Sequence, residues 1–174
     1  CSQYEHKVEA MTSYKTVFGS LKSYEKGRIE VINDDPKHYA FSNIFEVASK
    51  SKPFEKVAVA LNQQYVLEAI RAEGSSSWYV CDHDETVICM DGEVRIDLVK
   101  PSTPIHTAGQ DGAGLVNGDP TGKKMGHIVL RRGHQALLPK HCAYKFTATG
   151  VGALLQQTLL GPLTKQRWAS ICLS

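Results

Sequence analysis

The stretch that decides the fold runs from Trp78 to Gly92 and reads WYVCDHDETVICMDG. Its second part, Glu85 to Met90, is a β-type run, and a similar run follows from Glu93 to Val99. The pair Asp91-Gly92 lies between the two runs. Because glycine tolerates a positive φ, Asp-Gly in this position predicts a two-residue hairpin. The stretch therefore predicts antiparallel β-structure.

Further short β-type runs, separated by glycine, proline or polar turns, continue on both sides of this stretch. They lie at 57–61, 65–72, 127–130, 135–138, 143–148 and 153–160. For 65–72 the periodicity alone leaves helix and strand open. Many short strands with few helices predict an all-β sandwich or barrel. Residues 107–126 hold many glycines and little apolar content, so we expect a long exposed loop there.

The N-terminal third is less regular than the rest. Residues 12–21 fit a short helix or an extended arm, 27–33 and 39–47 alternate as strands do, and 49–53 is a turn or short linker. We therefore expect one barrel with additions at each end. The expected parts are an N-terminal extension (1–54), a barrel (55–165) that contains the glycine-rich insertion, and a C-terminal tail (166–174).

Composition excludes several classes of protein. The 174 residues, 42% of them hydrophobic, suffice for one domain with a full core. A net charge of +2 spread along the chain gives no basic patch, so we expect no nucleic-acid partner. No window is apolar over the roughly 18 residues that a membrane helix needs, and we see no secretory signal. Five cysteines without a C-x-x-C pair argue against a disulfide framework and favour the cytoplasm.

Glu85 and Gly92 also carry a resemblance to a known family. With six residues between them, they resemble the second half of the first sequence motif of the cupins, small β-barrels that usually hold iron, manganese or zinc. In that motif two histidines at His-x-His spacing precede the Glu. Here those positions fall on Tyr79 and Cys81, or, with a longer spacer, on the residue before each. Neither alignment supplies a histidine.

The second cupin motif is matched in part further along the chain. It reads roughly Gly, five residues, Pro-x-Gly-x-x-His, and this chain offers Gly133 and Pro139 in register. His141 stands where the motif has its second Gly, and Tyr144 stands where it has the metal-binding His. Phe146 matches an aromatic residue that often follows. The resemblance covers residues 55–160, implies a single cupin-type barrel (jelly roll), and favours a strand at 65–72.

The same resemblance bears on metal binding. An iron site of the two-His-one-carboxylate type needs two neutral imidazoles with open positions beside them. The aligned positions Tyr79, Cys81, Glu85 and Tyr144 supply a carboxylate and no imidazole. We therefore interpret these four residues as degenerate metal positions, and we expect neither a metal ion nor a catalytic residue in this chain.

Two alternatives stay open. On a strand, His83 and Glu85 point the same way, so with His134 or His141 they could form a stand-alone metal cupin, a dioxygenase or isomerase that uses iron or manganese. Against this, scattered histidines are usually structural. The other alternative is a metal-free barrel that binds a small molecule in an apolar lumen. That lumen would be lined by Cys142, Tyr144 and Phe146.

Within the cupins, the size, the glycine-rich insertion and the stretch from Trp78 to Val94 resemble the small subunit of two-component hydroquinone 1,2-dioxygenases. The resemblance implies a larger cupin catalytic subunit that binds Fe(II), assembled with this chain in a hetero-oligomer such as a heterotetramer. It implies that an aromatic diol, hydroquinone, reacts with O2 at the partner's site to give 4-hydroxymuconic semialdehyde. This chain would be a scaffold for that site.

Two parts of the chain are candidates for contact with such a partner. Trp78 begins the degenerate motif beside a serine turn, and we hypothesise that it reaches the partner's pocket and stacks on the substrate ring. The alternative is that Trp78 fills a core or an interface. The tail at 167–174 places apolar residues at a chain end, and it either contacts the partner or packs on its own barrel.

Overall fold

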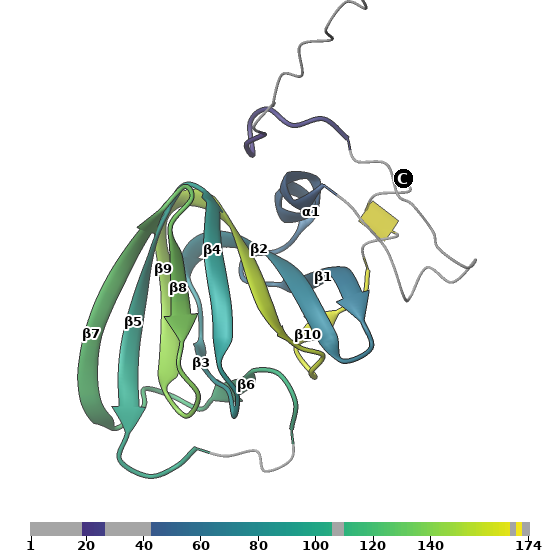
Figure 1. Cartoon of the computed structure of the whole chain (residues 1–174). Coiled ribbons are helices and arrows are strands. Elements are labelled where there is room, and N and C mark those ends of the chain that lie inside the picture. Colours follow the sequence, from purple (N-terminus) through teal and green to yellow (C-terminus); the bar gives the residue numbers. More distant parts are fainter. Residues whose placement is uncertain (1–18, 27–42, 106–109, 168–169, 172–174) are drawn as a thin grey trace, which may run out of the picture.

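The described part of the chain forms a curled β-sheet with helix α1 at its side (Figure 1). The computed structural model describes residues 19–26, 43–105, 110–167 and 170–171. Its elements are α1 (Ile44–Lys50), β1 (Lys56–Asn62), β2 (Tyr65–Ser75), β3 (Trp78–Val80), β4 (Glu85–Asp91), β5 (Glu93–Pro101), β6 (Gly114–Val116), β7 (Gly122–Arg131), β8 (Gln135–Leu138), β9 (Ala143–Leu159) and β10 (Thr164–Lys165). The all-β barrel expected from the sequence is confirmed, and residues 65–72 lie within strand β2.

Strand β9 is the centre of the sheet. Its C-terminal half pairs with β2 on one side and β4 on the other, which gives the order β10-β1-β2-β9-β4-β8. Its N-terminal half pairs with β3 and β5, which gives the order β6-β3-β9-β5-β7. The two halves curl toward each other (Figure 1), and the main apolar cluster lies between them. The members of this cluster from different strands include Ile70, Val87, Ile96, Leu138 and Phe146.

The segment at Asp91-Gly92 is a corner, so the predicted hairpin is wrong. Strands β4 and β5 both run antiparallel to β9, and their recorded partners are β8, β9 and β7. Gly92 has a φ of 77°, and a Cβ atom built on it would lie 2.8 Å from the Cα of Gly152. Glycine is therefore required here both by the backbone angle and by the close approach of β9.

Strand β9 replaces two expected strands. The sequence suggested separate runs at 143–148 and 153–160, but the structure has one strand from Ala143 to Leu159. A Cβ atom on Gly152 would lie 2.8 Å from the Asp91 carbonyl oxygen, so this glycine marks a close crossing inside the strand. In the sequence, Gly152 suggested the boundary between two strands. In the structure, it is the point where β9 passes from one half of the sheet to the other.

The expected exposed loop at 107–126 is wrong in its extent. Strand β6 and the beginning of β7 lie within that range, and Ala113 and Val116 are buried. A Cβ atom on Gly112 would lie 2.8 Å from the Cα of Gly161. Part of the glycine content therefore serves close backbone packing, a use that composition does not distinguish from flexibility. Residues 106–109 lie outside the described residues.

Helix α1 overturns the strand expected at 39–47 over residues 44–47. Asn43 is its N-cap, and the Asn43 side chain accepts hydrogen bonds from the backbone N–H groups of Phe45 (2.9 Å) and Glu46 (3.4 Å). Asn followed three residues later by Glu is a helix-start signature that competes with strand alternation. The expectations for 12–18, 27–33 and 39–42 fall outside the described residues.

Helix α1 and the end of the tail pack on the barrel. Val47 of α1 joins Val57 of β1 and Ile171 of the tail in one apolar cluster. The ammonium of Lys50 donates a hydrogen bond to the Ile171 carbonyl oxygen at 3.0 Å. At this residue the tail packs on its own chain, which is one of the two roles foreseen for it. Among the described residues, no helix is long and apolar enough to cross a membrane.

Candidate functional site

The four degenerate metal positions meet inside the barrel. Tyr79 on β3 and Tyr144 on β9 are register partners, and their ring centroids are 5.5 Å apart. Cys81 follows β3, Glu85 begins β4, and all four side chains are buried. The structure therefore brings together the residues that the motif alignment singled out, from strands that are far apart in the sequence.

Glu85 is held by two hydroxyl groups. Its Oε2 accepts a hydrogen bond from the Tyr144 hydroxyl at 2.6 Å, and its Oε1 accepts one from the Thr158 hydroxyl at 2.7 Å. The Glu85 residue is 1% exposed. Both carboxylate oxygens are thus engaged by neighbouring side chains, as burial of a charged group requires.

Further buried polar groups extend this arrangement across the barrel. Gln156 donates to the Tyr144 hydroxyl oxygen at 3.1 Å, and the Lys56 ammonium donates to Gln156 Oε1 at 2.7 Å. The same ammonium lies 3.6 Å from Glu68 Oε2. Glu68 Oε1 accepts a hydrogen bond from Thr164 at 2.6 Å. We call this set the barrel network. Its members are Lys56, Glu68, Glu85, Tyr144, Gln156, Thr158 and Thr164.

Sequence reasoning missed Lys56 and Glu68. The signal was available, because each is a charged residue within or at the head of an apolar strand pattern. In the structure, Lys56 is paired with Ile70 and Glu68 is paired with Ala58, so the two charges are diagonal neighbours on adjacent strands. Opposite charges at inward positions of neighbouring strands predict a buried ion pair.

Two tyrosines and one cysteine of the site favour their neutral forms, because their pKa values are raised. Burial, followed by the charge and hydrogen bond of Glu85, raises the pKa of Tyr144 well above its usual value. Burial and then the Glu85 charge raise the pKa of Cys81 to about 12. Burial and then the Glu68 charge raise the pKa of Tyr79. At neutral pH these residues are a phenol, a thiol and a phenol, so they act as hydrogen-bond donors and supply no nucleophile.

These residues do not fit an Fe(II) ion. The interior offers no imidazole at the aligned positions, and the one carboxylate there already accepts two hydrogen bonds. In the described ranges, no group of three or more His, Cys, Asp or Glu side chains is placed to hold a metal ion. A two-His-one-carboxylate site has no counterpart in this arrangement.

The ligand set of a stand-alone metal cupin is not brought together either. His83 lies in a bend before β4, so the strand alternation that would align it with Glu85 does not apply. His83 is one of the residues that line a shallow depression of ≈ 120 Å³, together with Tyr65 and Gln157. His134 sits at the turn between β7 and β8, where its Nδ1 accepts from the Arg131 N–H at 3.2 Å. His141 is at the surface, and its Nδ1 lies 3.5 Å from Asp82 Oδ1.

The apolar lumen foreseen for a small ligand is occupied by aromatic side chains. Tyr144 and Phe146 are completely buried and lie edge to face with ring centroids 5.4 Å apart. Phe54 stacks on Phe146 at 6.4 Å. The third residue expected there, Cys142, donates a hydrogen bond from its thiol to the sulfur of Met125 at 3.5 Å. Close packing of this kind leaves the space to protein atoms.

Trp78 points to the opposite side of β3 from Tyr79, as neighbours on a strand do. It packs against Val80 and Val116, and its indole N–H donates to Asp119 Oδ1 at 2.8 Å. The Lys145 ammonium lies 5.8 Å from the ring centroid. Trp78 is therefore outside the barrel network, half-buried on the outer face of the sheet.

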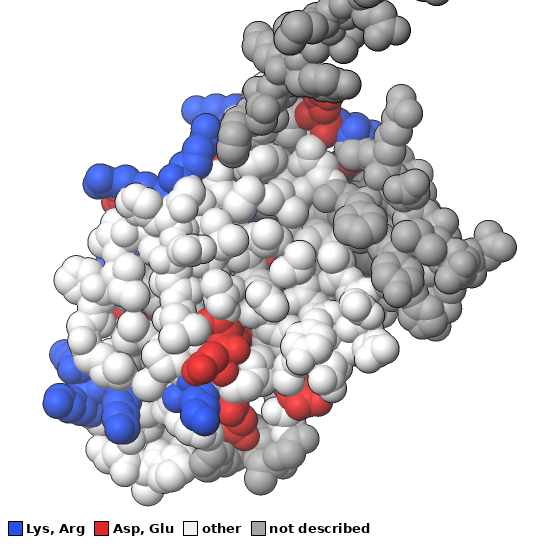
Figure 2. All heavy atoms as spheres, viewed as in Figure 1, with Lys and Arg blue, Asp and Glu red and all other residues white. Residues whose placement is uncertain are grey.

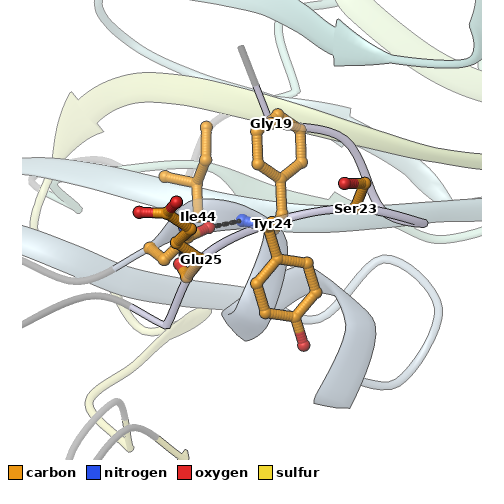
Figure 3. Close-up of a pocket in the computed structure, with 7 residues that line it drawn as sticks. Gly19, Ser23, Tyr24, Glu25 and Ile44 are labelled. Atoms are coloured by element: carbon orange, nitrogen blue, oxygen red, sulfur yellow. Dashed lines mark hydrogen bonds between the residues drawn. The ribbon is translucent and has the colours of Figure 1, made fainter. Parts of the chain in front are cut away.

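A larger hollow lies near the N-terminal side of α1. Figure 3 shows this pocket of ≈ 520 Å³, which is lined by Tyr24 and Glu25 of the N-terminal segment and by Ile44 of α1. The Asn43 side chain bridges the two walls by donating to the Glu25 carbonyl oxygen. The chain between these walls, residues 27–42, lies outside the described residues. We therefore build no site on this pocket.

The visible surface carries charge mainly at its margins. Figure 2 shows Lys and Arg gathered near the upper and lower ends of the face, and a wide field between them that is largely uncharged. Exposed apolar side chains include Leu137 on β8 and Val129 on β7.

Comparison with solved structures identifies close relatives. The chain is 50% identical to a chain of the hydroquinone 1,2-dioxygenase PnpCD in complex with Cd²⁺ and 4-hydroxybenzonitrile, with a TM-score of 0.81 over 95% of this chain and 100% of that one. It is 47% identical to a chain of the hydroquinone 1,2-dioxygenase from Sphingomonas sp. TTNP3 with 4-hydroxybenzoate bound. There the TM-score is 0.82 over 92% of this chain and 98% of that one.

A second kind of chain in the same enzyme shares only the fold. A PnpCD structure with Fe³⁺ contains a chain that is 14% identical, with a TM-score of 0.57 over 80% of this chain but only 38% of that longer one. No protein-family model and no curated protein matched. Identity near one half over almost the full length of both relatives decides the assignment: this chain belongs to the family of hydroquinone 1,2-dioxygenase subunits.

Proposed function

We propose that this chain is the small, non-metal-binding subunit of a hetero-oligomeric, iron(II)-dependent hydroquinone 1,2-dioxygenase. The enzyme would open the ring of hydroquinone with O2 to give 4-hydroxymuconic semialdehyde, a reaction in which both oxygen atoms enter the product. A larger cupin subunit would bind the iron and carry the catalysis. This chain would shape and close the partner's site, in a cytoplasmic assembly such as a heterotetramer.

The observation that carries the proposal is the state of Glu85. A carboxylate that binds iron must leave an oxygen free for the metal, whereas Tyr144 and Thr158 engage both Glu85 oxygens at hydrogen-bond distance. Tyr144, which stands where the cupin motif has its metal-binding histidine, is one of these two donors. Protein groups thus complete the hydrogen bonding of the Glu85 carboxylate. This supports a non-catalytic role for the subunit.

The comparisons support the existence of a partner. The PnpCD structures contain two kinds of chain. One is matched over its full length by this chain, and the other is longer, so that the match covers only 38% of it. The longer chain shares the fold at 14% identity, so it is a different protein with a related barrel. By this reasoning our chain has a longer partner of similar fold, in which the iron site would lie.

Trp78 is the residue that we propose as this chain's contribution to the partner's pocket. It is half-buried and lies on the outer face of the sheet. It packs against Val80 and Val116, donates a hydrogen bond to Asp119 and makes a cation–π contact with Lys145. An aromatic ring in that position suits stacking on an aromatic diol.

The test is to purify this chain alone and together with its larger partner, anaerobically with Fe(II) supplied, and to measure iron and hydroquinone turnover. We expect close to zero iron and no turnover for the chain alone, and both in the complex. About one iron per isolated chain would contradict the proposal, because a ligand set of the required kind would then exist in this barrel. His83 and Glu85 would in that case be the first residues to replace.

A further inference from the structure

The barrel network holds a buried cation beside two of the degenerate metal positions. The Lys56 ammonium lies 5.0 Å from the ring centroid of Tyr79, one of those positions. Through Gln156 it reaches the hydroxyl of Tyr144, another of them. Lys56 is only 3% exposed. A buried lysine is costly unless it is paired, so its presence here calls for a role that compensates the cost.

The hydrogen bonds of the network run in one direction. Lys56 donates to Gln156 at 2.7 Å, Gln156 donates to Tyr144 at 3.1 Å, and Tyr144 donates to Glu85 at 2.6 Å. Each donor therefore points away from the ammonium and toward the carboxylate. Hydrogen bonds aligned in this way polarise one another, so the positive charge of Lys56 strengthens the hydrogen bond that Glu85 accepts from Tyr144.

The second carboxylate depends on Lys56 directly. Glu68 Oε1 accepts from Thr164, but Glu68 Oε2 is buried without a hydrogen-bond donor among the described residues, and it faces the Lys56 ammonium at 3.6 Å. One cation thus stabilises two buried carboxylates: Glu68 by direct charge attraction, and Glu85 through the hydrogen bonds of Gln156 and Tyr144. The residues that it ties together come from β1, β2, β4, β9 and β10.

We propose that the Lys56 ammonium takes the place of a metal ion in this barrel, as the interior cation that holds Glu68 and Glu85 and orients the Tyr144 hydroxyl. The inference rests on the metal-free part of the proposed function. In a metal-binding barrel the central cation joins side chains from several strands. Here a covalently attached cation does the same, so the interior needs no ion from solution.

The first test compares Lys56→Met with Arg131→Met in thermal unfolding of the full chain. Methionine keeps the volume of Lys56 and removes its charge. We expect Lys56→Met to lower Tm by about 10 °C, since breaking a buried pair leaves uncompensated charge. Arg131 is the control, because it pairs with Glu93 at 2.6 Å while the two side chains are 71% and 45% exposed. Arg131→Met should shift Tm by no more than about 2 °C.

A double variant tests the assignment of the charge. If Lys56 compensates Glu68, then Lys56→Met with Glu68→Gln should melt above Lys56→Met alone, because the uncompensated carboxylate is gone while an acceptor for Thr164 is kept. Chemical rescue tests the same point differently. Propylammonium should raise the Tm of Lys56→Ala by several degrees, whereas 1-propanol at the same concentration should not.

The outcomes separate the two proposals. Equal Tm values for Lys56→Met and Arg131→Met, or equal rescue by propylammonium and 1-propanol, would overturn the role of Lys56 and leave the proposed function standing, provided that the wild-type chain holds no iron. Iron bound by the isolated wild-type chain would overturn the metal-free subunit itself. If Lys56→Ala fails to fold, Lys56→Met and the double variant still decide the matter.

Discussion

The two faces of strand β3 differ in how completely their side chains are held. Tyr79 points into the barrel, where it is buried beside Tyr144 and lies 5.0 Å from the Lys56 ammonium. Trp78, its neighbour, points outward, is half-buried against Val80 and Val116, and donates an exposed hydrogen bond to Asp119. The inner face is satisfied by the chain's own groups, whereas the outer face has an aromatic ring to offer to another molecule. We infer that the inner face maintains the fold and that the outer face serves the assembly.

The largest expected effect is on the inner face. Glu85→Leu should lower Tm by about 10 °C, because Tyr144 and Thr158 would lose the acceptor for their buried hydroxyl groups. The measurement is a thermal melt with a tryptophan fluorescence or circular dichroism readout. Trp78→Ala in the same melt should shift Tm far less. If Trp78→Ala were the more destabilising variant, the assignment of the two faces would be reversed.

On the outer face the expected loss is of turnover. Trp78→Ala should reduce hydroquinone turnover of the complex by roughly tenfold to a hundredfold, since stacking and burial of an aromatic ring are lost. Assembly, measured by size-exclusion chromatography, should be unchanged. Leu137→Ala is the matched control, because Leu137 is 55% exposed on β8 and apolar. Loss of assembly with Trp78→Ala would instead assign this residue to packing at the interface.

A smaller effect is expected when only one donor of the network is removed. Tyr144→Phe takes away the hydrogen bond to Glu85 and the acceptor for Gln156 while keeping the ring. We expect a Tm about 5 °C below wild type, from a cost of about 1–3 kcal/mol. Thr86→Val, at a half-buried position of the same strand as Glu85, controls for the loss of a hydroxyl group. Equal shifts for the two variants would mean that the Tyr144 bond contributes nothing specific.

The smallest effect is on thiol chemistry. Burial and then nearby carboxylates raise the pKa of Cys81 to about 12 and that of Cys89 to about 11. A raised folded-state pKa means that these thiols add stability below their ordinary pKa near 9, and that this stability is lost as the pH rises toward 11 and 12. At pH 8 a thiol reagent should therefore label both only after unfolding. Rapid labelling of Cys81 in the native protein would show that the inner face is open.

The many short β-type runs predicted an all-β architecture, and the resemblance to the cupin motifs aligned Glu85 and Tyr144 with positions of one site, where the structure has them in contact. The sequence could not predict that Asp91-Gly92 is a corner. The local backbone angle is the same in a hairpin and in a bend, and pairing with β9 decides between them. Lys56 was missed for a similar reason, since its partner Glu68 is identified only when β1 and β2 are placed side by side.

Strand β9 has a consequence for how the protein is made. The sheet order places β9 between β2 and β4 in one half and between β3 and β5 in the other, so each half needs residues from Ala143 to Leu159. A ribosome synthesises the chain from its N-terminus, so β1 to β8 emerge before the strand that joins them. Neither half of the sheet can therefore close before β9 has been synthesised, and one late segment completes the core of both halves together.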